Sequence, residues 1–474
     1  MSERQNRERD QDRERIRLLE FQLDYLRAEL LHLTHERYRL IYSVSGHIYR
    51  FLRPIEASIA DAANAVAARF RRRSPETIQT APAPSAPPAV LAPLPARRLL
   101  VDVTGTIKRD AGTGIQRVVK EVTRGLYGGE RFDIPAVAVR CADGRLLTAN
   151  GLVAELIGGD ASPDSEIAIE AGDRFLMLSD SWNAFDALAP IFEKIRGEGG
   201  EVVTCIFDLI PELYPHACHE VTVPRYRDWL RKALLESDGF LAISRTVADE
   251  LAEYVAVQGL SHRAGLKIGW FHCGSDLALR ADAAPNEKIR AAVVGGAPVF
   301  LTVGTIEPRK GQRVALRAFE ELWANGRDIR LIVVGRRGWF EEATANEILA
   351  HAEFGRRLFW FEDVDDDALS FLYDHAAALI FPSYAEGFGL PIVEAARRGR
   401  PAICSDIPVF REVGGSGALY FRVNDAKALA QTIADFLDGR RAGDPEQVLR
   451  VAWRDAARRI VEVIAREEWS RRLP

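Results

Sequence analysis

The sequence predicts an α/β protein with two doubly wound domains that face a cleft, preceded by an α-helical segment. From residue 97 onward, short apolar runs alternate with helical patterns, which is typical of parallel sheets covered by helices. The runs fall into two sets, separated at residues 281–297 by a stretch with proline and glycine but no strand. A chain of 474 residues is also too long for one ordinary core.

Residues 1–73 form the predicted helical segment, and residues 16–51 carry an apolar heptad pattern of about five heptads. Arg37 and His47 interrupt the apolar seam. One isolated helix cannot bury such a seam, so the helix needs a partner. The pattern therefore predicts a coiled coil that forms either a homo-oligomer or a complex with another coiled-coil protein.

The end of this segment, residues 41–73, is amphipathic in places and finishes in a basic group at residues 69–73. Such a group suits peripheral contact with an anionic membrane surface, and it suits a solvated helix end equally well. Residues 74–97 are rich in proline and alanine and cannot form a core. We expect them to be a semi-stiff linker.

The two predicted domains span residues 98–280 and 298–450, with a hinge at residues 281–297. Strands of the first are expected at residues 99–103, 174–180, 201–208, 239–244 and 267–274. Strands of the second are expected at residues 299–304, 329–335, 358–363, 377–383 and 400–406. The cleft between two such domains is a usual place for a small ligand.

Composition argues against several classes of function. With 63 Lys and Arg residues against 68 Asp and Glu residues, the net charge is −5, and no overall basic field suits nucleic acid. The five cysteines form no C-x-x-C pair, which favours a reducing compartment. His216, Cys218 and His219 lack a second ligand pair at suitable spacing, so no metal is expected. Without an apolar signal core or a membrane-spanning run, a cytoplasmic location is expected.

The stretch "YAEGFGLPIVEAARRG" at residues 384–399 places two glutamates, Glu386 and Glu394, around a glycine-rich turn. The turn follows a predicted buried strand, and ligands of open parallel sheets bind at the carboxyl ends of strands. Pro391 suits the first turn of a helix. The amides before it would point out of the helix N-terminus, where a phosphate is favoured. The residues of this turn are Gly387, Phe388, Gly389 and Leu390.

Two carboxylates beside a phosphate site need hydrogen-bond donors as partners. Sugar and ribose hydroxyls are such donors, and one carboxylate accepts from two of them. The pattern therefore favours a nucleotide sugar, with one glutamate for the sugar and one for the ribose. The alternative is ordinary acidic capping of a helix. The third glycine of the dinucleotide-binding fingerprint is missing.

A basic pair, Arg309 and Lys310, occurs in "VFLTVGTIEPRKGQ". We expect the pair to open the helix after the strand that ends at Gly304. Two cations and helix amides together could neutralise a leaving diphosphate. The spacing of an ATPase phosphate loop is absent.

These motifs, followed by "ICSDIPVFREV" at residues 403–413, occur in the order found in glycosyltransferase family four, which the chain resembles. The resemblance is strongest over about residues 298–425 and extends more weakly from about residue 99. It implies the GT-B fold, with two Rossmann-like domains, and retaining transfer of a sugar from a nucleotide diphosphate sugar without a bound metal or other cofactor. Residues 451–474 resemble the closing helix of the family.

The resemblance also assigns roles to residues. Arg309 and Lys310 match the cations on the diphosphate, Glu386 matches the glutamate near the donor sugar, and Glu394 matches the ribose-binding glutamate. Cations on the leaving group would be the main electrostatic help to the reaction. The turn between the glutamates matches the donor-binding loop of the family.

On the acceptor side, Gly112 and Gly114 match a glycine loop near the donor, where the backbone must approach the sugar and its phosphates. Asp208 lies in "CIFDLIPELYPHAC", where the family often carries His-Asp and this chain has Phe207-Asp208. Asp208 is therefore either a site residue or a cap of a turn or helix.

The stretch "DVDDDAL" at residues 363–369 imitates a metal-binding D-x-D motif. It stands between a predicted strand and a predicted helix. Helix capping is the better interpretation.

The predicted function is transfer of a sugar to a growing glycan of a bacterial surface polysaccharide. The segment "GTIEPRKG" at residues 304–311 is similar to segments of bacterial mannosyl- and rhamnosyltransferases. GDP-mannose is therefore the first expected donor, and a dTDP- or UDP-sugar the next. The acceptor would be a glycan or a lipid-linked glycan, reached in the cytoplasm or at the inner face of the membrane. The alternative is a non-catalytic scaffold that keeps the transferase fold.

Overall fold

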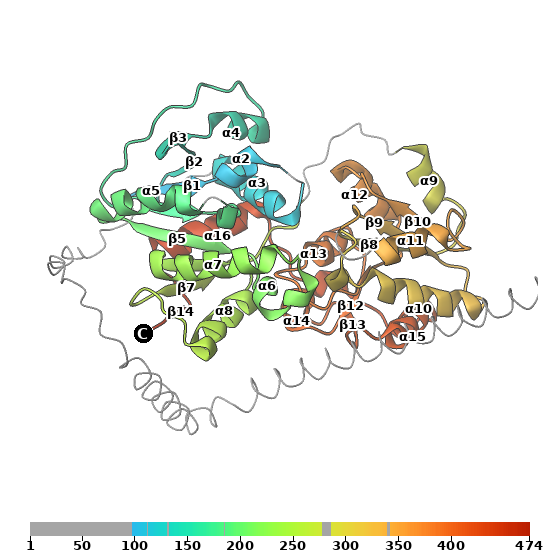
Figure 1. The fold of residues 1–474 in the computed structure, drawn as a ribbon. Coiled ribbons are helices and arrows are strands. Elements are labelled where there is room, and N and C mark those ends of the chain that lie inside the picture. The colour runs from blue at the N-terminus through green and yellow to red at the C-terminus, as the bar shows by residue number, and fades with distance from the viewer. Residues whose placement is uncertain (1–96, 111, 130–131, 184, 277–285, 339–341) are drawn as a thin grey trace, which may run out of the picture. The chain divides into compact units, whose positions relative to one another are not determined.

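The computed structural model describes residues 97–474, apart from residues 111, 130–131, 184, 277–285 and 339–341 (Figure 1). The predicted coiled coil at residues 16–51, the basic segment and the linker up to residue 96 lie outside the described residues. Residues 97–474 belong to one compact unit that contains two sheets.

The first sheet is mostly parallel and has the strand order β14-β7-β6-β5-β4-β1-β2-β3. Among the described strands of this sheet, the two outermost pairs, β2–β3 and β7–β14, are antiparallel. Strands β1, β4, β5, β6 and β7 begin at the predicted positions or within the predicted ranges. The strands are β1 (Leu99–Asp102), β2 (Ala136–Ala142), β3 (Arg145–Thr148), β4 (Arg174–Met177), β5 (Glu201–Ile206), β6 (Gly239–Ala242), β7 (Lys267–Trp270) and β14 (Arg471–Arg472).

Both faces of the first sheet are buried, which explains its continuous apolar strands. Alternate residues of β1 point to opposite faces: Leu99 belongs to the core on the side of α3 and α16, and Leu100 to the core on the side of α5 and α7. The helices of this half are α2 (Thr104–Lys108), α3 (Gly114–Tyr127), α4 (Asn150–Ile157), α5 (Phe185–Gly197), α6 (Ile210–Leu213), α7 (Thr222–Glu236) and α8 (Arg245–Gln258).

The second sheet is parallel throughout its described strands and has the order β10-β9-β8-β11-β12-β13. Five of its strands fall within the predicted ranges, whereas β13 was not predicted. The strands are β8 (Val299–Val303), β9 (Arg330–Val334), β10 (Leu358–Phe361), β11 (Ala378–Phe381), β12 (Ala402–Ser405) and β13 (Leu419–Phe421). The helices that follow are α10 (Gln312–Ala324), α11 (Glu342–Ala350), α12 (Asp366–His375), α13 (Leu390–Arg397), α14 (Pro408–Gly414) and α15 (Ala426–Leu437).

The segment predicted as a hinge, residues 281–297, contains helix α9 (Glu287–Val293). Asn286 caps this helix, because its side chain accepts a hydrogen bond from the amide of Ile289 at 3.0 Å. Residues 277–285 are not described. The division of the chain at this hinge stays a prediction.

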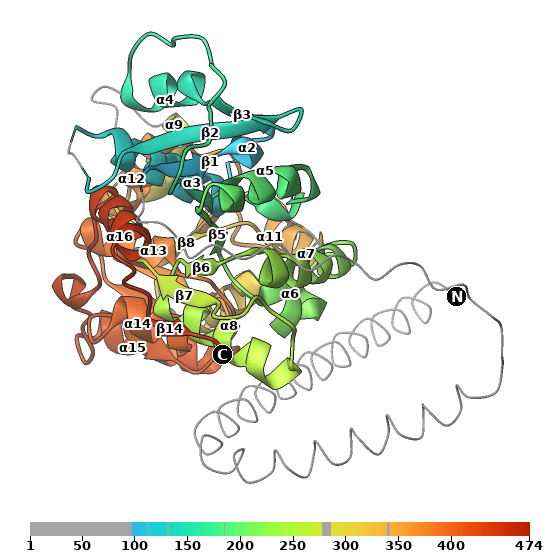
Figure 2. The ribbon, with the colours of Figure 1, turned by 90° about the vertical axis from the view of Figure 1, so that its left-hand side faces the viewer.

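The end of the chain lies against the first sheet. Helix α16 (Trp453–Ala465) packs against α3 and β7, and β14 pairs with β7 at the edge of the sheet. Figures 1 and 2 show α16, in red, among the blue and green elements of the first half. Gly274 and Gly125 make this packing possible, since an added Cβ would lie 2.4 Å from the Trp453 ring and 2.8 Å from the Trp453 carbonyl oxygen, respectively.

All five cysteines are buried and free of disulfide bonds. In the part of the chain that the structure describes, no helix has the length and apolar character needed to cross a membrane. The same residues contain no group of three or more His, Cys, Asp or Glu side chains placed to hold a metal ion.

Candidate active site

The basic pair follows the first strand of the second sheet. Gly304, with φ 147°, ends the strand, and Arg309 and Lys310 lie in a short 3-10 turn (Pro308–Lys310). The pair therefore precedes helix α10, whereas the sequence predicted that the pair opens this helix. Gly311 joins turn and helix with φ 68°, and an added Cβ there would lie 2.4 Å from the Pro382 carbonyl oxygen. This close approach holds the turn against the loop that carries Glu386.

Glu386 bridges the two cations. Its Oε2 accepts a hydrogen bond from Arg309 Nη1 at 2.7 Å, and its Oε1 accepts one from Lys310 Nζ at 2.6 Å. Arg309 Nη2 also forms an ion pair with Oε1 of the buried Glu307 at 2.7 Å. Burial opposes ionisation of Glu386, but the two cations outweigh it and lower the pKa of its carboxyl group to about 2.

Arg309 and Lys310 differ in how many of their hydrogen-bond donors are already used. Arg309 donates to Glu386 and the Ala385 carbonyl oxygen and forms an ion pair with Glu307. Within the described residues, Glu386 is the one hydrogen-bond partner of Lys310 Nζ, so this ammonium keeps two free donors. Burial lowers the pKa of Lys310, and the neighbouring Arg309 lowers it further. With two free donors, Lys310 is the cation best able to bind an added anion, and that anion would in turn favour its charged form.

Asp208 of the first sheet lies close to this group. It follows β5, and its Oδ1 accepts a hydrogen bond from the Ile210 amide at 2.9 Å, so it does cap the turn that begins α6. Burial raises the pKa of Asp208, and Arg309 partly offsets this effect. Asp208 thus combines the capping role with a position beside the basic pair.

Gly387 is the point of closest approach between the loop after β11 and the first half of the chain. An added Cβ would lie 1.9 Å from the Phe207 carbonyl oxygen, a distance no side chain tolerates. Ser244 Oγ donates a hydrogen bond to the Gly387 carbonyl oxygen at 2.8 Å. Gly389 has φ 107° and precedes α13, so glycine is needed at both positions for different reasons.

The other loop residues have simpler roles. Phe388 is buried, and Leu390 begins α13 with Pro391 in its first turn. This is the helix start that the sequence predicted.

Glu394 lies in α13 and makes contacts separate from those of Glu386. Its side chain is 3 % exposed, its Oε2 accepts a hydrogen bond from the Tyr373 hydroxyl at 2.9 Å, and its Oε1 pairs with Arg117 Nη1 at 3.1 Å. Arg117 comes from α3 and also pairs with Asp366 of α12 at 3.1 Å. The sequence did not single out Arg117 or Tyr373. Arg117 could have been noted as the first cation after Gly114.

The glycine loop before α3 is open. Gly112 has φ 63°, and an added Cβ at Gly112 or Gly114 would meet no atom within 4 Å. Thr113 and Gln116 form a capping box at the start of α3. The structure gives these glycines room, and their approach to a donor stays a prediction.

The acidic stretch at residues 363–369 behaves as a helix start. Asp365 caps α12, because its Oδ1 accepts a hydrogen bond from the Ala368 amide at 2.8 Å. Asp363 pairs with Arg336 at 3.2 Å, and Asp366 pairs with Arg117. The interpretation of this stretch as helix capping is confirmed.

Glu412, which the sequence did not single out, links the second half to the first. This residue of α14 accepts hydrogen bonds from the amides of Arg245 and Thr246 at 2.8 Å each, and so caps α8 from outside. His272 Nε2 lies 2.7 Å from Glu412 Oε1. Although burial opposes ionisation, these contacts lower the pKa of Glu412 to about 2.

The chain is similar to known glycosyltransferases. Residues 285–459 match the family model "Glycosyl transferases group 1". The serotype-specific mannosyltransferase WbdA of Escherichia coli is 30% identical over 347 residues, which are 72% of this chain and 43% of WbdA. The O-antigen chain mannosyltransferase B of Escherichia coli is 34% identical over 169 residues, which are 35% of this chain and 43% of that protein. The chain thus spans less than half the length of these relatives.

A solved structure of Alr3699/HepE from Anabaena, in complex with UDP and glucose, has a TM-score of 0.50 and 15% sequence identity to this chain. The likeness covers 79% of this chain and 98% of that structure. At this identity the likeness concerns the fold alone, and it agrees with the two parallel sheets of a GT-B protein. Residues 285–459 are thus similar in sequence to the group 1 glycosyl transferases.

Proposed function

We propose that this protein transfers a sugar from a nucleotide diphosphate sugar to a growing glycan of a bacterial surface polysaccharide, with retention of anomeric configuration and without a metal. The observation that carries the proposal is the buried bridge of Glu386 between Arg309 and Lys310 at the carboxyl edge of the second sheet. It is supported by Asp208, which faces the same cations from the first sheet.

The cations would act on the leaving group. As the bond between sugar and diphosphate breaks, positive charge develops on the sugar and negative charge on the diphosphate. Lys310, with two free donors, would hold the diphosphate, and Arg309 would add its charge from a fixed position. Such charges are already oriented, so the protein need not reorganise during the reaction.

Glu386 and Glu394 would serve different ends of the donor. Glu386 keeps the two cations together before the donor binds and would then accept hydrogen bonds from the sugar hydroxyls. Glu394 would accept from the ribose hydroxyls, sharing its carboxylate with Tyr373 and Arg117. The amides from Gly387 to Leu390 would contact the phosphates, and Gly112 and Gly114 leave room for the donor on the opposite side.

We propose GDP-mannose as the donor, because WbdA and the other curated relatives described above are named mannosyltransferases. The acceptor would be a glycan or a lipid-linked glycan, reached in the cytoplasm or at the inner face of the membrane. UDP- and dTDP-sugars are the next donors to test.

The first experiment measures the melting temperature of the full chain with GDP, UDP and dTDP. A ligand that binds only the native state raises the melting temperature. At a concentration 100 times the dissociation constant, it adds about 2.7 kcal/mol to the free energy of unfolding. We expect GDP to give the largest rise. If none of the three changes the melting temperature, the protein does not bind donors, and the scaffold hypothesis replaces the proposal.

The second experiment measures mannose transfer from GDP-mannose. Lys310→Ala should lower the rate by roughly two to three orders of magnitude, because one preorganised charge contact contributes about 3 to 4 kcal/mol to a transition state. Lys427→Ala removes an exposed lysine of α15 and should leave the rate unchanged. Equal rates in both variants would remove Lys310 from the site. The anomeric configuration of the product and the effect of EDTA test retention and metal independence.

We also propose that residues 16–51 make the protein oligomeric or attach it to a coiled-coil partner. Light scattering on the full chain and on residues 97–474 would compare their masses. If both contain the same number of chains per particle, self-association through this helix is excluded.

A further inference from the structure

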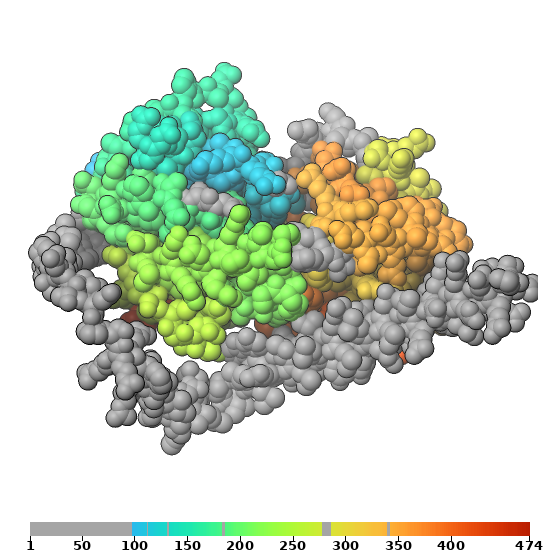
Figure 3. Space-filling view, viewed as in Figure 1, coloured from blue at the N-terminus to red at the C-terminus, as the bar shows by residue number. Residues whose placement is uncertain are grey.

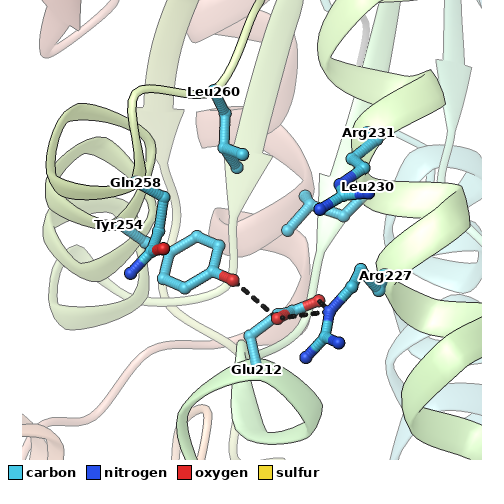
Figure 4. Close-up of a pocket in the computed structure, with 7 residues that line it drawn as sticks. All are labelled: Glu212, Arg227, Leu230, Arg231, Tyr254, Gln258 and Leu260. Atoms are coloured by element: carbon cyan, nitrogen blue, oxygen red, sulfur yellow. Dashed lines mark hydrogen bonds and ion pairs between the residues drawn. The ribbon is translucent and has the colours of Figure 1, made fainter. Parts of the chain in front are cut away.

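A polar hollow lies between helices α6, α7 and α8, away from the basic pair. Its volume is about 170 Å³, and its walls carry side chains from all three helices (Figure 4). These helices form part of the green surface in the space-filling view (Figure 3). Pockets for drug-sized ligands measure about 300 to 1,000 Å³. This hollow therefore has room for one ring-sized ligand and not for a nucleotide.

Glu212 organises the hollow. Its side chain is 2 % exposed, and it accepts hydrogen bonds from Arg227 Nε at 3.2 Å and from the Tyr254 hydroxyl at 2.6 Å. Figure 4 shows the guanidinium of Arg227 and the ring of Tyr254 directed at this carboxylate from opposite sides. The buried charge is therefore matched, and an arginine and an aromatic ring are held in fixed positions on α7 and α8.

The rest of the lining offers both free donors and apolar contact. Among the described residues, none forms a hydrogen bond with the side chain of Arg231 or of Gln258. Leu260, which is half-buried, adds an apolar part to the wall, whereas Leu230 is 1 % exposed and adds little. A sugar ring needs this combination. Its hydroxyls form hydrogen bonds with planar polar groups such as guanidinium and amide, and its C–H faces pack on aromatic and apolar surfaces. A simple anion would gain nothing from the leucines.

The hollow is connected to the candidate active site. Glu212 lies in α6, four residues after Asp208, which caps the turn that begins this helix. Tyr226 of α7 donates a hydrogen bond to the Asp208 carbonyl oxygen, and the next residue, Arg227, binds Glu212. Two adjacent residues of α7 therefore contact Asp208 of the candidate site and Glu212 of the hollow.

Helix α8 provides a second connection. Residues at positions i and i+4 lie on one side of a helix, so Thr246, Glu250, Tyr254 and Gln258 form a polar ridge. The ridge starts at Thr246, which binds Glu412 of the second half. It passes Glu250, which lies near Asp208, and ends at the hollow.

We propose that the hollow binds one sugar unit of the acceptor glycan, remote from the hydroxyl that receives the new sugar. That the bound sugar belongs to an acceptor rests on the proposed function, whereas the sugar site itself rests on the lining. Occupation of the hollow would hold a long glycan along the ridge of α8 toward Asp208. The protein would then favour acceptors of several sugar units over a single sugar.

Transfer from GDP-mannose to α-linked mannose oligosaccharides of one to four units tests this proposal in the full chain. The wild type should show a stepwise fall in KM at the acceptor length that first reaches the hollow. Arg231→Ala should raise KM for the longer acceptors about tenfold, with no change for methyl α-mannoside or in KM for the donor. Arg225→Ala, also exposed on α7 but outside the lining, is the matched control. If Arg231→Ala raises KM by the same factor for acceptors of every length, the proposal is overturned.

Ligand-observed NMR with the same mannose oligosaccharides, in the absence of donor, gives a readout that needs no activity. The wild type and Arg225→Ala should give a binding signal, and Arg231→Ala and the space-filling Leu260→Trp should lose it. If transfer from every nucleotide sugar fails while these differences persist, the sugar site stands and the proposed function falls. If transfer occurs but the variants bind and use all acceptors like the wild type, the hollow is not a sugar site. Binding of inorganic phosphate in place of the oligosaccharides would also overturn it.

Discussion

Replacement of Glu386 by glutamine removes the charge that holds Arg309 and Lys310 together. The carboxylate accepts hydrogen bonds from both cations at 2.6 to 2.7 Å and is 9 % exposed. In Glu386→Gln the amide fills the same space but leaves two neighbouring positive charges, of which Arg309 keeps its ion pair with Glu307, with Asp208 nearby. We expect the folded protein to lose stability at neutral pH and to slow sugar transfer.

The magnitude follows from the pKa of Glu386, which is lowered from 4.5 to about 2 in the folded protein. Each pH unit corresponds to about 1.4 kcal/mol, so ionised Glu386 contributes roughly 3 kcal/mol to stability. Because the folded-state pKa lies below the ordinary value, this contribution is complete above pH 4.5. It is lost as the pH falls from 4.5 toward 2. The variant should therefore be less stable than the wild type at pH 7 and equal to it near pH 2.

Thermal and urea unfolding from pH 3 to pH 8 measure this difference, and Glu193→Gln, an exposed site on α5, is the control. A diphosphate would replace the missing negative charge, so GDP should raise the melting temperature of the variant more than that of the wild type. Equal stability of variant and wild type at pH 5 to 8 would refute the reasoning about the bridge. An equal effect of GDP on both would show that the diphosphate does not bind these cations.

Three further changes have defined outcomes. Gly387→Ala should lower stability by about 1 to 3 kcal/mol and impair transfer, because the new Cβ would lie 1.9 Å from the Phe207 carbonyl oxygen. Arg117→Leu should cost about 1 to 3 kcal/mol in urea unfolding, since Glu394 stays buried without its cation, although the 22 % exposure of Arg117 limits the loss. At pH values above 4.5, Glu250→Gln should raise the melting temperature, and this increase should grow up to about pH 8. Burial and the nearby Asp208 raise the pKa of Glu250 to about 8, so its charge opposes folding in that range.

Each of these changes has its own control. Gly114→Ala adds a Cβ that meets no atom within 4 Å at the first residue of α3, and it should not lower stability, because alanine favours a helix more than glycine does. Addition of Glu394→Gln to Arg117→Leu should restore part of the lost stability, and no recovery would mean that the ion pair is not the cause. For Glu250→Gln, a gain of the same size at pH 4 and at pH 8 would contradict the assignment to ionisation.

The sequence predicted the strands with continuous apolar runs, because burial on both faces leaves a clear local signal. It missed the β2–β3 hairpin, although Asp143 and Gly144 carry the turn with φ values of 49° and 70°. Asp-Gly between apolar alternations is a strong hairpin signal, and it could have been used. Strands β13 and β14 are too short to show a pattern of their own.

The candidate site was predictable where one sheet edge brings residues together. Glu386, Arg309 and Lys310 follow neighbouring strands, β11 and β8, of the second sheet, so the carboxyl-end rule places them side by side. Arg117 and Glu412 were not predictable in this way. Each forms ion pairs or hydrogen bonds with residues more than a hundred positions away in the sequence, and that placement depends on how the two halves pack.

The return of α16 and β14 to the first sheet matters for the order of events during synthesis. Trp453 fills the space above Gly274, and Arg471 and Arg472 complete an edge of a sheet whose first strand begins at Leu99. On the ribosome, β8 to β13 emerge before these residues do. The second sheet can therefore complete its strands while the first half still exposes the apolar surface that α16 covers. Until that moment the nascent first half is the part most exposed to aggregation and most in need of a chaperone.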